Sequence, residues 1–383
     1  MCGTSKKEYL EKIRWRYRHS GKRRKSKILD EFCEVCGYER KYAIKLLGGR
    51  KKKALRRPGP KSKYGTEVLA VLKVIWLAAD QMCSKRLKAA LVLWLPYYET
   101  SYGTLELELR AKLLAISRGT IDRLLKPIRV KFRGKGLGGT KPGSLLKNQI
   151  PIRTDNWDIK TPGFMEADTV AHCGQSMAGE FVWSLAFTDI ATGWTETRAV
   201  WNKGAAGVMT QVHDIEEKLP FELLGFDCDN GSEFLNHHLW SYFVNRKKPV
   251  QFTRSRPYKK NDNAHIEQKN WTHVRQLLGY DRFENPDLVE ALNQLYTNEW
   301  GAYQNFFCPS VKLVEKKRVG SKYQKRYDEP QTPYQRLLAW EGLSAQAKES
   351  LAHNFAPLNP FELKKVIERK LKIISAINKV PSL

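Results

Sequence analysis

The chain has 383 residues, which is too long for one ordinary domain and about right for two or three. Its apolar fraction of 42% and aromatic fraction of 11% allow sizeable cores and exclude wholesale disorder. The formal net charge of +27 indicates a polyanionic partner, and nucleic acid is the first candidate, although ribosome-associated and membrane-surface proteins are also basic.

The charge is distributed unevenly along the chain. Residues 1–60 hold 20 Lys/Arg against 6 Asp/Glu, residues 161–230 hold 3 against 11, and residues 231–275 hold 9 against 3. An acidic island between basic flanks is unusual for a protein that only coats DNA. It is expected where carboxylates hold cations beside a bound phosphate backbone.

The cysteines and the apolar segments bear on the cellular compartment. Seven scattered cysteines, an odd number, indicate reduced thiols rather than a disulfide scaffold. The first residues lack the apolar segment of a secretory signal. The longest apolar run, 68–79, is interrupted by Lys73 and is shorter than the roughly 20 residues that span a bilayer. We expect a soluble, cytoplasmic protein, associated with the nucleoid and without a membrane partner.

Residues 1–60 are predicted to form an all-α helix-turn-helix domain. Between residues 26 and 47 the apolar pattern favours two short helices around a turn at Gly37. Cys33 and Cys36 fit the core where these helices approach; half of a zinc site is the alternative, but no second Cys or His pair follows at ligand spacing. The predicted DNA contacts of the second helix are Arg40, Lys41 and Lys45.

Residues 64–132 are predicted to form a second helical unit. Within it, residues 111–125 resemble another helix-turn-helix, with Ser117 as the N-cap of the second helix and Arg118 as a DNA contact. An ordinary helix pair explains the same pattern equally well. Residues 133–160 follow as a linker, because the segment 134–143 carries five Gly and one Pro.

The pattern changes after the linker. Strands are expected at residues 164–171, 181–189, 195–200, 223–228 and 250–253. Helices are expected at residues 204–219, 233–245 and 263–278. Three strands followed by alternating helices and strands indicate an α/β layered domain with a mixed sheet over residues 161–300.

Three acidic residues of this domain are placed so that they can meet. Asp168 lies in the middle of a hydrophobic strand, where a carboxylate is costly unless it is paired or binds a metal. Asp229 ends a buried strand, at the kind of sheet edge where ligands gather. Glu267 opens a helix directly after a basic loop.

Residues 161–300 resemble the catalytic core of retroviral integrases and bacterial insertion-sequence transposases, the DDE superfamily, whose core has an RNase H-like fold. Residues 227–236, DCDNGSEFLN, are similar to the second-aspartate motif D-N-G-x-E-F, and residues 262–267, DNAHIE, are similar to the glutamate motif. The resemblance implies that Asp168, Asp229 and Glu267 are both the catalytic residues and the metal ligands. Asn270, one helical turn after the glutamate, also matches the retroviral pattern and is predicted to contact DNA, whereas Trp271 stands where a lysine often follows.

The resemblance implies a transposase that cleaves DNA strands at transposon ends and transfers them into target DNA. Two Mg²⁺ (or Mn²⁺) ions per active site would serve both steps, since these ions prefer oxygen ligands. The implied partners are double-stranded DNA, as terminal repeats and as target, and further copies of the chain. An RNase H-like nuclease that cuts without joining, and a DNA-binding regulator with a decayed core, are the alternatives.

Other acids near the three carboxylates have competing interpretations. Asp227, two residues before Asp229 on the same strand face, is the rival for the second ligand position, although the D-N-G motif favours Asp229. Glu166 stands in the same relation to Asp168 and is expected to be a structural acid or an acid that supports the metal ligands. Glu233 is expected to be an acid in the first turn of a helix, with a metal ligand as the alternative.

The basic and imidazole side chains of the domain also have two interpretations. His172 and His265 can contact metal or the scissile phosphate, or can be hydrogen-bonded structural histidines. The loop cations are predicted to line the DNA groove, with a solvated loop as the alternative: Arg254, Arg256, Lys259 and Lys260.

Residues 301–383 are predicted to be a basic C-terminal region. The segment 312–326 is strongly basic, and the segment 332–338, TPYQRLL, resembles a short motif downstream of the core in bacterial transposases. Residues 361–378 predict a basic amphipathic helix that packs on the core or binds DNA.

Overall fold

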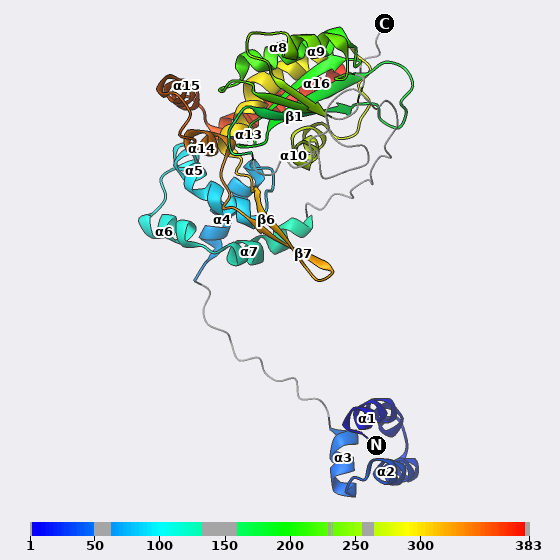
Figure 1. The fold of residues 1–383 in the computed structure, drawn as a ribbon. Helices are drawn as coiled ribbons and strands as arrows, with labels where there is room; N and C mark the ends of the chain where they lie inside the picture. Colours follow the sequence, from blue (N-terminus) through cyan, green and yellow to red (C-terminus); the bar gives the residue numbers. More distant parts are fainter. Residues whose placement is uncertain are drawn as a thin grey trace. The chain divides into compact units, whose positions relative to one another are not determined.

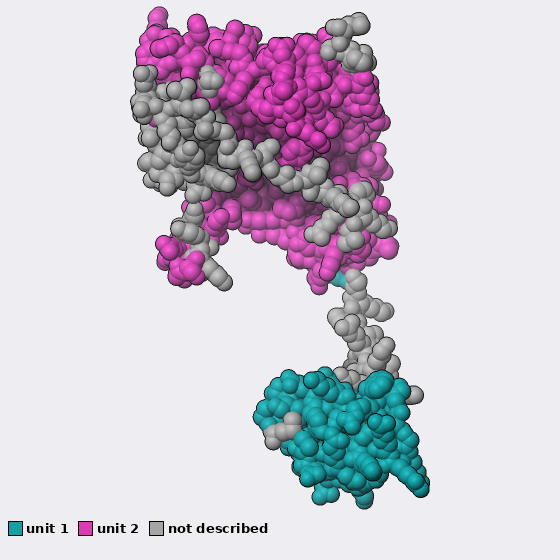
Figure 2. Space-filling view, turned by 90° about the vertical axis from the view of Figure 1, so that its right-hand side faces the viewer, with its two compact units in different colours: residues 1–63 teal, residues 64–383 magenta. Residues whose placement is uncertain are grey.

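The computed structural model of the chain describes residues 2–49, 63–131, 159–228, 231, 233–254 and 264–379. The chain divides into two compact units, Met1–Lys63 and Tyr64–Leu383, which are coloured separately in Figure 2. Each unit has a hydrophobic core of its own.

The first unit consists of three helices: α1 (Gly3–Arg18), α2 (Lys22–Cys36) and α3 (Arg40–Gly48). Gly37 ends α2 with a φ of 66°, a left-handed conformation that glycine adopts without strain. The predicted pair of helices around this turn is confirmed. Cys36 is buried and Cys33 packs against the same cluster, which agrees with their assignment to the core.

The second unit begins with four helices: α4 (Thr66–Ala78), α5 (Ser84–Tyr102), α6 (Leu107–Ala115) and α7 (Arg118–Lys131). The backbone N–H of Thr120 donates to Ser117 Oγ at 3.2 Å, so the predicted N-cap of α7 is confirmed. Apolar side chains of all four helices lie in one core cluster with residues of the C-terminal helices.

The α/β part of this unit contains a five-stranded sheet: β1 (Phe164–Ala171), β2 (Val182–Asp189), β3 (Thr195–Trp201), β4 (Gly225–Cys228) and β5 (Gln251–Arg254). The strand order is β3-β2-β1-β4-β5. β1, β2 and β3 pair antiparallel, whereas β1, β4 and β5 pair parallel. The predicted mixed sheet is therefore confirmed, and β1 lies at its centre (Figure 1).

Helices flank both faces of the sheet. On one face lie α8 (Ala205–Lys218) and α9 (His237–Val244) (Figure 1). They bury side chains such as Val212 and Phe243 in one cluster with Phe187 and Phe226 of the sheet. The other side is covered by a long segmented helix and by further helices: α10 (Ala264–Lys269), η1 (Asn270–Arg275), α11 (Gln276–Leu278), α12 (Leu288–Gln294), η2 (Leu295–Trp300) and α13 (Gly301–Phe307). The two η segments are π-helical, a rare geometry that often accompanies functional sites.

One predicted helix boundary is wrong. The helix expected at residues 233–245 begins only at His237, because Asn236 takes an extended conformation and its side chain accepts the N–H of Leu239 at 2.9 Å. Glu233 therefore lies in the turn before α9 and is not an acid of its first turn.

The C-terminal part contains a two-stranded ribbon and three helices: β6 (Leu313–Val319), β7 (Lys322–Tyr327), α14 (Pro333–Leu338), α15 (Ala345–Phe355) and α16 (Pro360–Ile377). Of the two interpretations of the last helix, core packing is the one observed, because Phe361, Ile367 and Ile374 are buried in the cluster that also holds Trp94. Among the described residues, no helix has the length and apolar character that crossing a membrane requires.

Candidate active site

Asp168 lies in the middle of β1, with its carboxylate only partly buried. Its Oδ1 accepts the backbone N–H of Thr169 at 2.8 Å, and its Oδ2 accepts Asn270 Nδ2 at 2.6 Å. Because an ionised carboxylate only accepts hydrogen bonds, the amide of Asn270 must present its NH₂ group to Asp168. This bond joins two parts of the chain that are 102 residues apart.

Asn270 is the first residue of η1 and follows directly on α10. Its amide Oδ1 is buried and has no hydrogen-bond partner among the described residues. A buried oxygen without a partner is costly, so this position is suited to a bound water, a cation or a donor from a ligand. The sequence predicted Asn270 as a DNA contact, and the structure places it first of all against the strand aspartate.

The other two predicted metal ligands can be located only in part. Glu267 belongs to α10, one helical turn before Asn270, but its side chain lies outside the described residues. Asp229 follows directly on Cys228, the last residue of β4, and also lies outside them. β4 is the parallel neighbour of β1, and Cys228 pairs with Ala167.

Glu166 fixes the start of the helix that carries Glu267. Its carboxylate is fully buried, and Oε2 accepts the backbone N–H of Ile266 at 3.0 Å. The first N–H groups of a helix have no partner within the helix, and an anion at this end is also favoured by the helix dipole. Glu166 thus has the structural role that was expected, and it connects β1 to α10.

Asp227, the rival for the second ligand position, is buried in β4. Its Oδ1 accepts the hydroxyl of Thr253 on β5 at 2.6 Å. In the sheet register Asp227 pairs with Glu166 and Thr253. Its carboxylate therefore has a fixed partner on the strand that lies on the far side of β4 from β1.

Glu233 is a buried acid beside the predicted site, and the sequence did not anticipate its partners. Its Oε1 accepts the hydroxyl of Thr169, the residue after Asp168, at 2.9 Å. Lys203 lies 3.2 Å from its Oε2 and also stacks on the Trp183 ring, with the ammonium 4.7 Å from the centroid. The turn before α9 is thereby tied to β1.

His172 is structural, which was one of its two predicted interpretations. It is fully buried, its Nε2 is 2.8 Å from Ser184 Oγ, and its ring stacks on Phe283 with centroids 4.8 Å apart. Burial, followed by the charge of Arg275, lowers the pKa of His172 to about 3, so the ring is neutral near pH 7. The side chain of His265 lies outside the described residues.

A cluster of partly buried cations surrounds the turn between β2 and β3. Three successive carbonyl oxygens each accept a different cation: Ala191 O accepts Lys312 at 2.5 Å, Thr192 O accepts Arg336 at 3.4 Å, and Gly193 O accepts Lys269 at 3.0 Å. Lys269 belongs to α10 and Arg336 to α14. We call residues 191–193 the carbonyl turn. Through these contacts it joins α10 to the C-terminal part.

Lys269 is partly buried in this cluster. Burial, together with the nearby charges of Arg86 and Arg336, lowers its pKa to about 7. The sequence does carry a signal for its position, since Lys269 falls at i+3 from Ile266 and i−4 from His273, on the buried side of the helical pattern.

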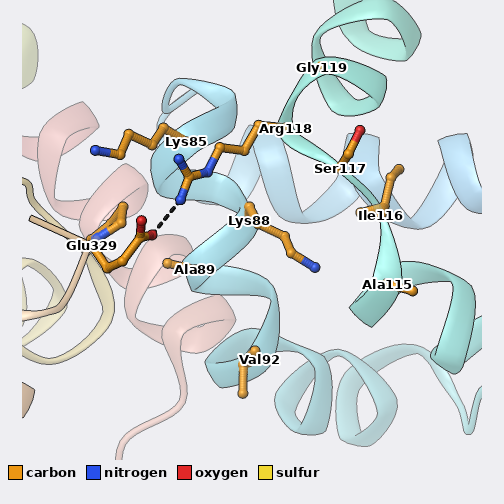
Figure 3. Close-up of a pocket in the computed structure, with 11 residues that line it drawn as sticks. Lys85, Lys88, Ala89, Val92, Ala115, Ile116, Ser117, Arg118, Gly119 and Glu329 are labelled. Atoms are coloured by element: carbon orange, nitrogen blue, oxygen red, sulfur yellow. Dashed lines mark hydrogen bonds and ion pairs between the residues drawn. The ribbon is translucent and has the colours of Figure 1, made fainter.

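The predicted DNA contacts of the helical regions lie on exposed surfaces. Lys41 and Lys45 are exposed on α3, and Arg40 at its first position contacts Asp30 and donates to Ser26 Oγ at 2.8 Å. Arg118 begins α7, forms an ion pair with Glu329, and lines a pocket of about 690 Å³ (Figure 3).

Of the four predicted cations of the basic loop, only Arg254 lies among the described residues. Arg254 is the last residue of β5 rather than a loop residue, and it is buried, so the alternative of a solvated loop residue does not hold for it. Arg256, Lys259 and Lys260 lie outside the described residues.

The donor set fits a hard divalent cation. Among the described residues no group of three His, Cys, Asp or Glu side chains is arranged to hold a metal, but this set excludes the side chains of Asp229 and Glu267. The described part of the site offers Asp168 carboxylate oxygens and the unpartnered Asn270 Oδ1, and oxygen ligands are those that Mg²⁺ and Mn²⁺ prefer.

Comparison with known proteins places the chain in a family. No protein-family model matches it. One similar solved structure is the catalytic core domain of BIV integrase, with a TM-score of 0.30 and 17% identity, covering 46% of this chain and 94% of that chain. Another is the HTLV-2 integrase catalytic core domain in complex with magnesium, with a TM-score of 0.28 and 13% identity, covering 39% of this chain and 90% of that chain. The "Uncharacterized protein y4rM" of Sinorhizobium fredii is 41% identical over 336 residues, which cover 87% of this chain and 95% of that protein. The chain therefore belongs to the same protein family as y4rM of Sinorhizobium fredii.

Proposed function

We propose that the protein is a metal-dependent polynucleotidyl transferase of the DDE type, acting as a transposase that cleaves transposon ends and joins them to target DNA. The observation that carries the proposal is the 2.6 Å hydrogen bond between Asn270 and Asp168. It brings α10, the helix that carries Glu267, against β1, the strand that carries Asp168. A metal site shared by the two carboxylates requires this proximity. The parallel pairing of β1 with β4, whose last residue precedes Asp229, supports the same arrangement.

In this proposal Asp168, Asp229 and Glu267 hold two Mg²⁺ or Mn²⁺ ions. Bound ions of this kind supply positive charge that activates an attacking oxygen and stabilises a leaving oxygen at phosphorus. Asn270 orients Asp168 by donating to its Oδ2, and Glu166 fixes the start of α10 by accepting the N–H of Ile266. Both residues act on the position of the carboxylates, which must be held to within fractions of an ångström.

The substrate in this proposal is double-stranded DNA, bound as terminal repeats and as target by several copies of the chain. The net charge of +27 supports a polyanionic substrate. The exposed cations of α3 support a contact by the first unit, and Arg118 with its neighbours supports a contact by α7. The cationic side chains of these helices would bind phosphates, while the carboxylates of the sheet act on the strand.

The test is an in vitro reaction with the purified full-length protein. Labelled duplexes that carry the inverted repeats flanking the gene are incubated with a plasmid target in Mg²⁺, in Mn²⁺ and in chelator. We expect cleavage at the repeat ends and joined products in Mg²⁺ and Mn²⁺, and neither in chelator. Cleavage without joining would identify a nuclease instead. Duplex binding without cleavage in any of the three conditions would favour a regulator and contradict the proposal.

A further inference from the structure

The ribbon formed by β6 and β7 has an unusual concentration of positive charge. Between Leu313 and Tyr327 six residues are basic and one, Glu315, is acidic. The basic residues are Lys316, Lys317, Arg318, Lys322, Lys325 and Arg326. Such a density indicates a surface for a polyanion rather than part of a core.

The ribbon is not stabilised by the burial of its strands. Among the described residues its two strands pair with each other and with no strand of the five-stranded sheet. The described side chains of the strands are largely exposed, including the apolar Val314 at 54% and Val319 at 47%. Isolated two-stranded hairpins are marginally stable in water, so little in the free protein favours an extended, exposed pair of this kind.

The pairing of the strands also brings like charges together. In the ribbon register Lys316 is directly opposite Lys325. Like charges at directly opposed positions destabilise an antiparallel pair, and the single acid, Glu315, forms an ion pair with Arg326 at 3.1 Å. A polyanion that lies along the ribbon would relieve this repulsion.

The base of the ribbon is fixed to the helices α5 and α7. Asp328 closes it, since its Oδ1 accepts the N–H of Lys312 at 2.6 Å and its own N–H donates to Lys312 O at 3.0 Å. Lys85 of α5 donates to Asp328 O at 3.0 Å. Next in the chain, Glu329 forms an ion pair with Arg118, the first residue of α7 (Figure 3).

The ribbon and α7 therefore belong to one surface. Figure 1 shows β6 and β7 beside α7, and the contact between Arg118 and Glu329 joins the two elements. The pocket at this junction is lined by Lys85, Lys88 and Arg118 (Figure 3). α7 adds the exposed cations Arg123 and Lys126. Cations on two elements of fixed relative position can follow a phosphate backbone along part of a duplex.

We propose that the β6–β7 ribbon is a second DNA-binding element of this protein, which contacts the phosphates of duplex DNA together with α7. This inference rests on the proposed function in that DNA is the substrate. A two-stranded ribbon fits the width of the major groove, and exposed Lys and Arg neutralise the phosphates on its edges. The proposal assigns the cations of the ribbon to phosphates, so the expected contribution is to affinity rather than to sequence preference.

The test uses the full-length protein and a fluorescent duplex of random sequence in the absence of divalent metal, with binding measured by anisotropy over a series of salt concentrations. The variant carries Lys317→Glu and Lys325→Glu, and the control carries Arg369→Glu and Lys372→Glu on exposed positions of α16. We expect the ribbon variant to bind at least about 10-fold more weakly, with a slope of log K against log salt shallower by about 2, since each phosphate contact contributes about 0.9. The control should bind nearly as wild type does.

Thermal unfolding of the same variants separates binding from folding. Lys325→Glu places an acid opposite Lys316, so the ribbon variant should be as stable as wild type or more so while its DNA affinity falls. Wild-type affinity and slope in the ribbon variant would overturn the inference, as would an equal loss in the control or an altered oligomeric state without a change in affinity. The proposed function is judged separately, by wild-type cleavage of the terminal repeats.

Discussion

At the scale of single residues, Asn270 is the side chain on which the geometry of the candidate site depends most directly. It donates to Asp168 Oδ2 at 2.6 Å, and its own Oδ1 is buried without a protein partner among the described residues. The sequence motif identified the residue, but it could not show which of its two amide groups contacts the aspartate. That choice follows from the carboxylate, which can only accept.

Removal of this amide should impair strand cleavage more than DNA binding. We expect Asn270→Ala to lower the cleavage rate by about 10- to 100-fold, because a hydrogen bond to a charged group contributes about 1.5–3 kcal/mol. Gln268→Ala, an exposed position on the same helix, is the matched control and should cleave at the wild-type rate. A loss of duplex affinity equal to the loss of cleavage would instead make Asn270 primarily a DNA contact.

Lys269 should make stability depend on pH in an unusual direction. Its pKa is lowered to about 7 in the folded protein, whereas an unfolded lysine titrates near 10.4. Between these values the unfolded chain binds more protons, so this residue's contribution to the free energy of unfolding rises with pH. Below about pH 7 the ammonium is charged in both states and its full burial cost is present.

Comparison with a neutral residue of similar shape measures this effect. We expect wild type to gain stability relative to Lys269→Met as the pH increases from about 7 to 10, by up to about 1.4 kcal/mol per pH unit. Urea unfolding at several pH values gives the difference. A difference that does not change over this range would show that the ammonium is not buried in the folded state.

At the scale of elements, the hydrophobic patterns predicted most of the sheet and its helices, since strands such as β2 and helices such as α8 have apolar faces of the expected period. The two strands of the ribbon were not predicted, because apolar and polar residues do not alternate along them and the charged residues have no regular spacing. The start of α9 was misplaced because Asn236, rather than the residues near Glu233, caps the helix. The contacts of the carbonyl turn could not be read from a motif, because they join three distant segments.

Arg336 shows what the conspicuous TPYQRLL segment does in the fold. Thr332 and Gln335 form a capping box that starts α14, and Arg336 then donates to Ser310 O at 2.7 Å, to Asp328 Oδ2 at 2.9 Å and to Thr192 O at 3.4 Å. The side chain is 8% exposed, so its acceptors would lose a partner that water replaces poorly.

Arg336→Met should therefore lower the free energy of unfolding by about 2–4 kcal/mol. Arg369→Met on an exposed position of α16 is the control and should change it by less than about 0.5 kcal/mol. Arg336→Lys should recover only part of the loss, since an ammonium cannot reach several acceptors at once. Denaturation in urea measures the free energy of unfolding of each variant. Equal stability of the Met variant and wild type would refute the structural role.

At the scale of the whole molecule, the division after Lys63 separates a small helical unit with a core of its own from the unit that carries the sheet. We expect the fragment Met1–Lys63 to be helical by circular dichroism and to bind duplex DNA with affinity that falls steeply as salt increases. Lys41→Glu with Lys45→Glu should weaken that binding, while Lys7→Glu with Lys12→Glu on α1 serves as the charge-matched control. Equal effects of both pairs would argue against α3 as the DNA-contacting helix.

The central claim is that Asp168, Asp229 and Glu267 act as one metal-binding set. The most direct measurement is the rate of end cleavage for Asp168→Asn, Glu267→Gln and the double variant, each with intact duplex binding. Because residues that act as a unit are not additive, we predict that each single variant loses at least about 1,000-fold and that the double variant is no slower than the slower single variant. Near wild-type cleavage by either single variant, or losses that multiply in the double variant, would contradict the claim.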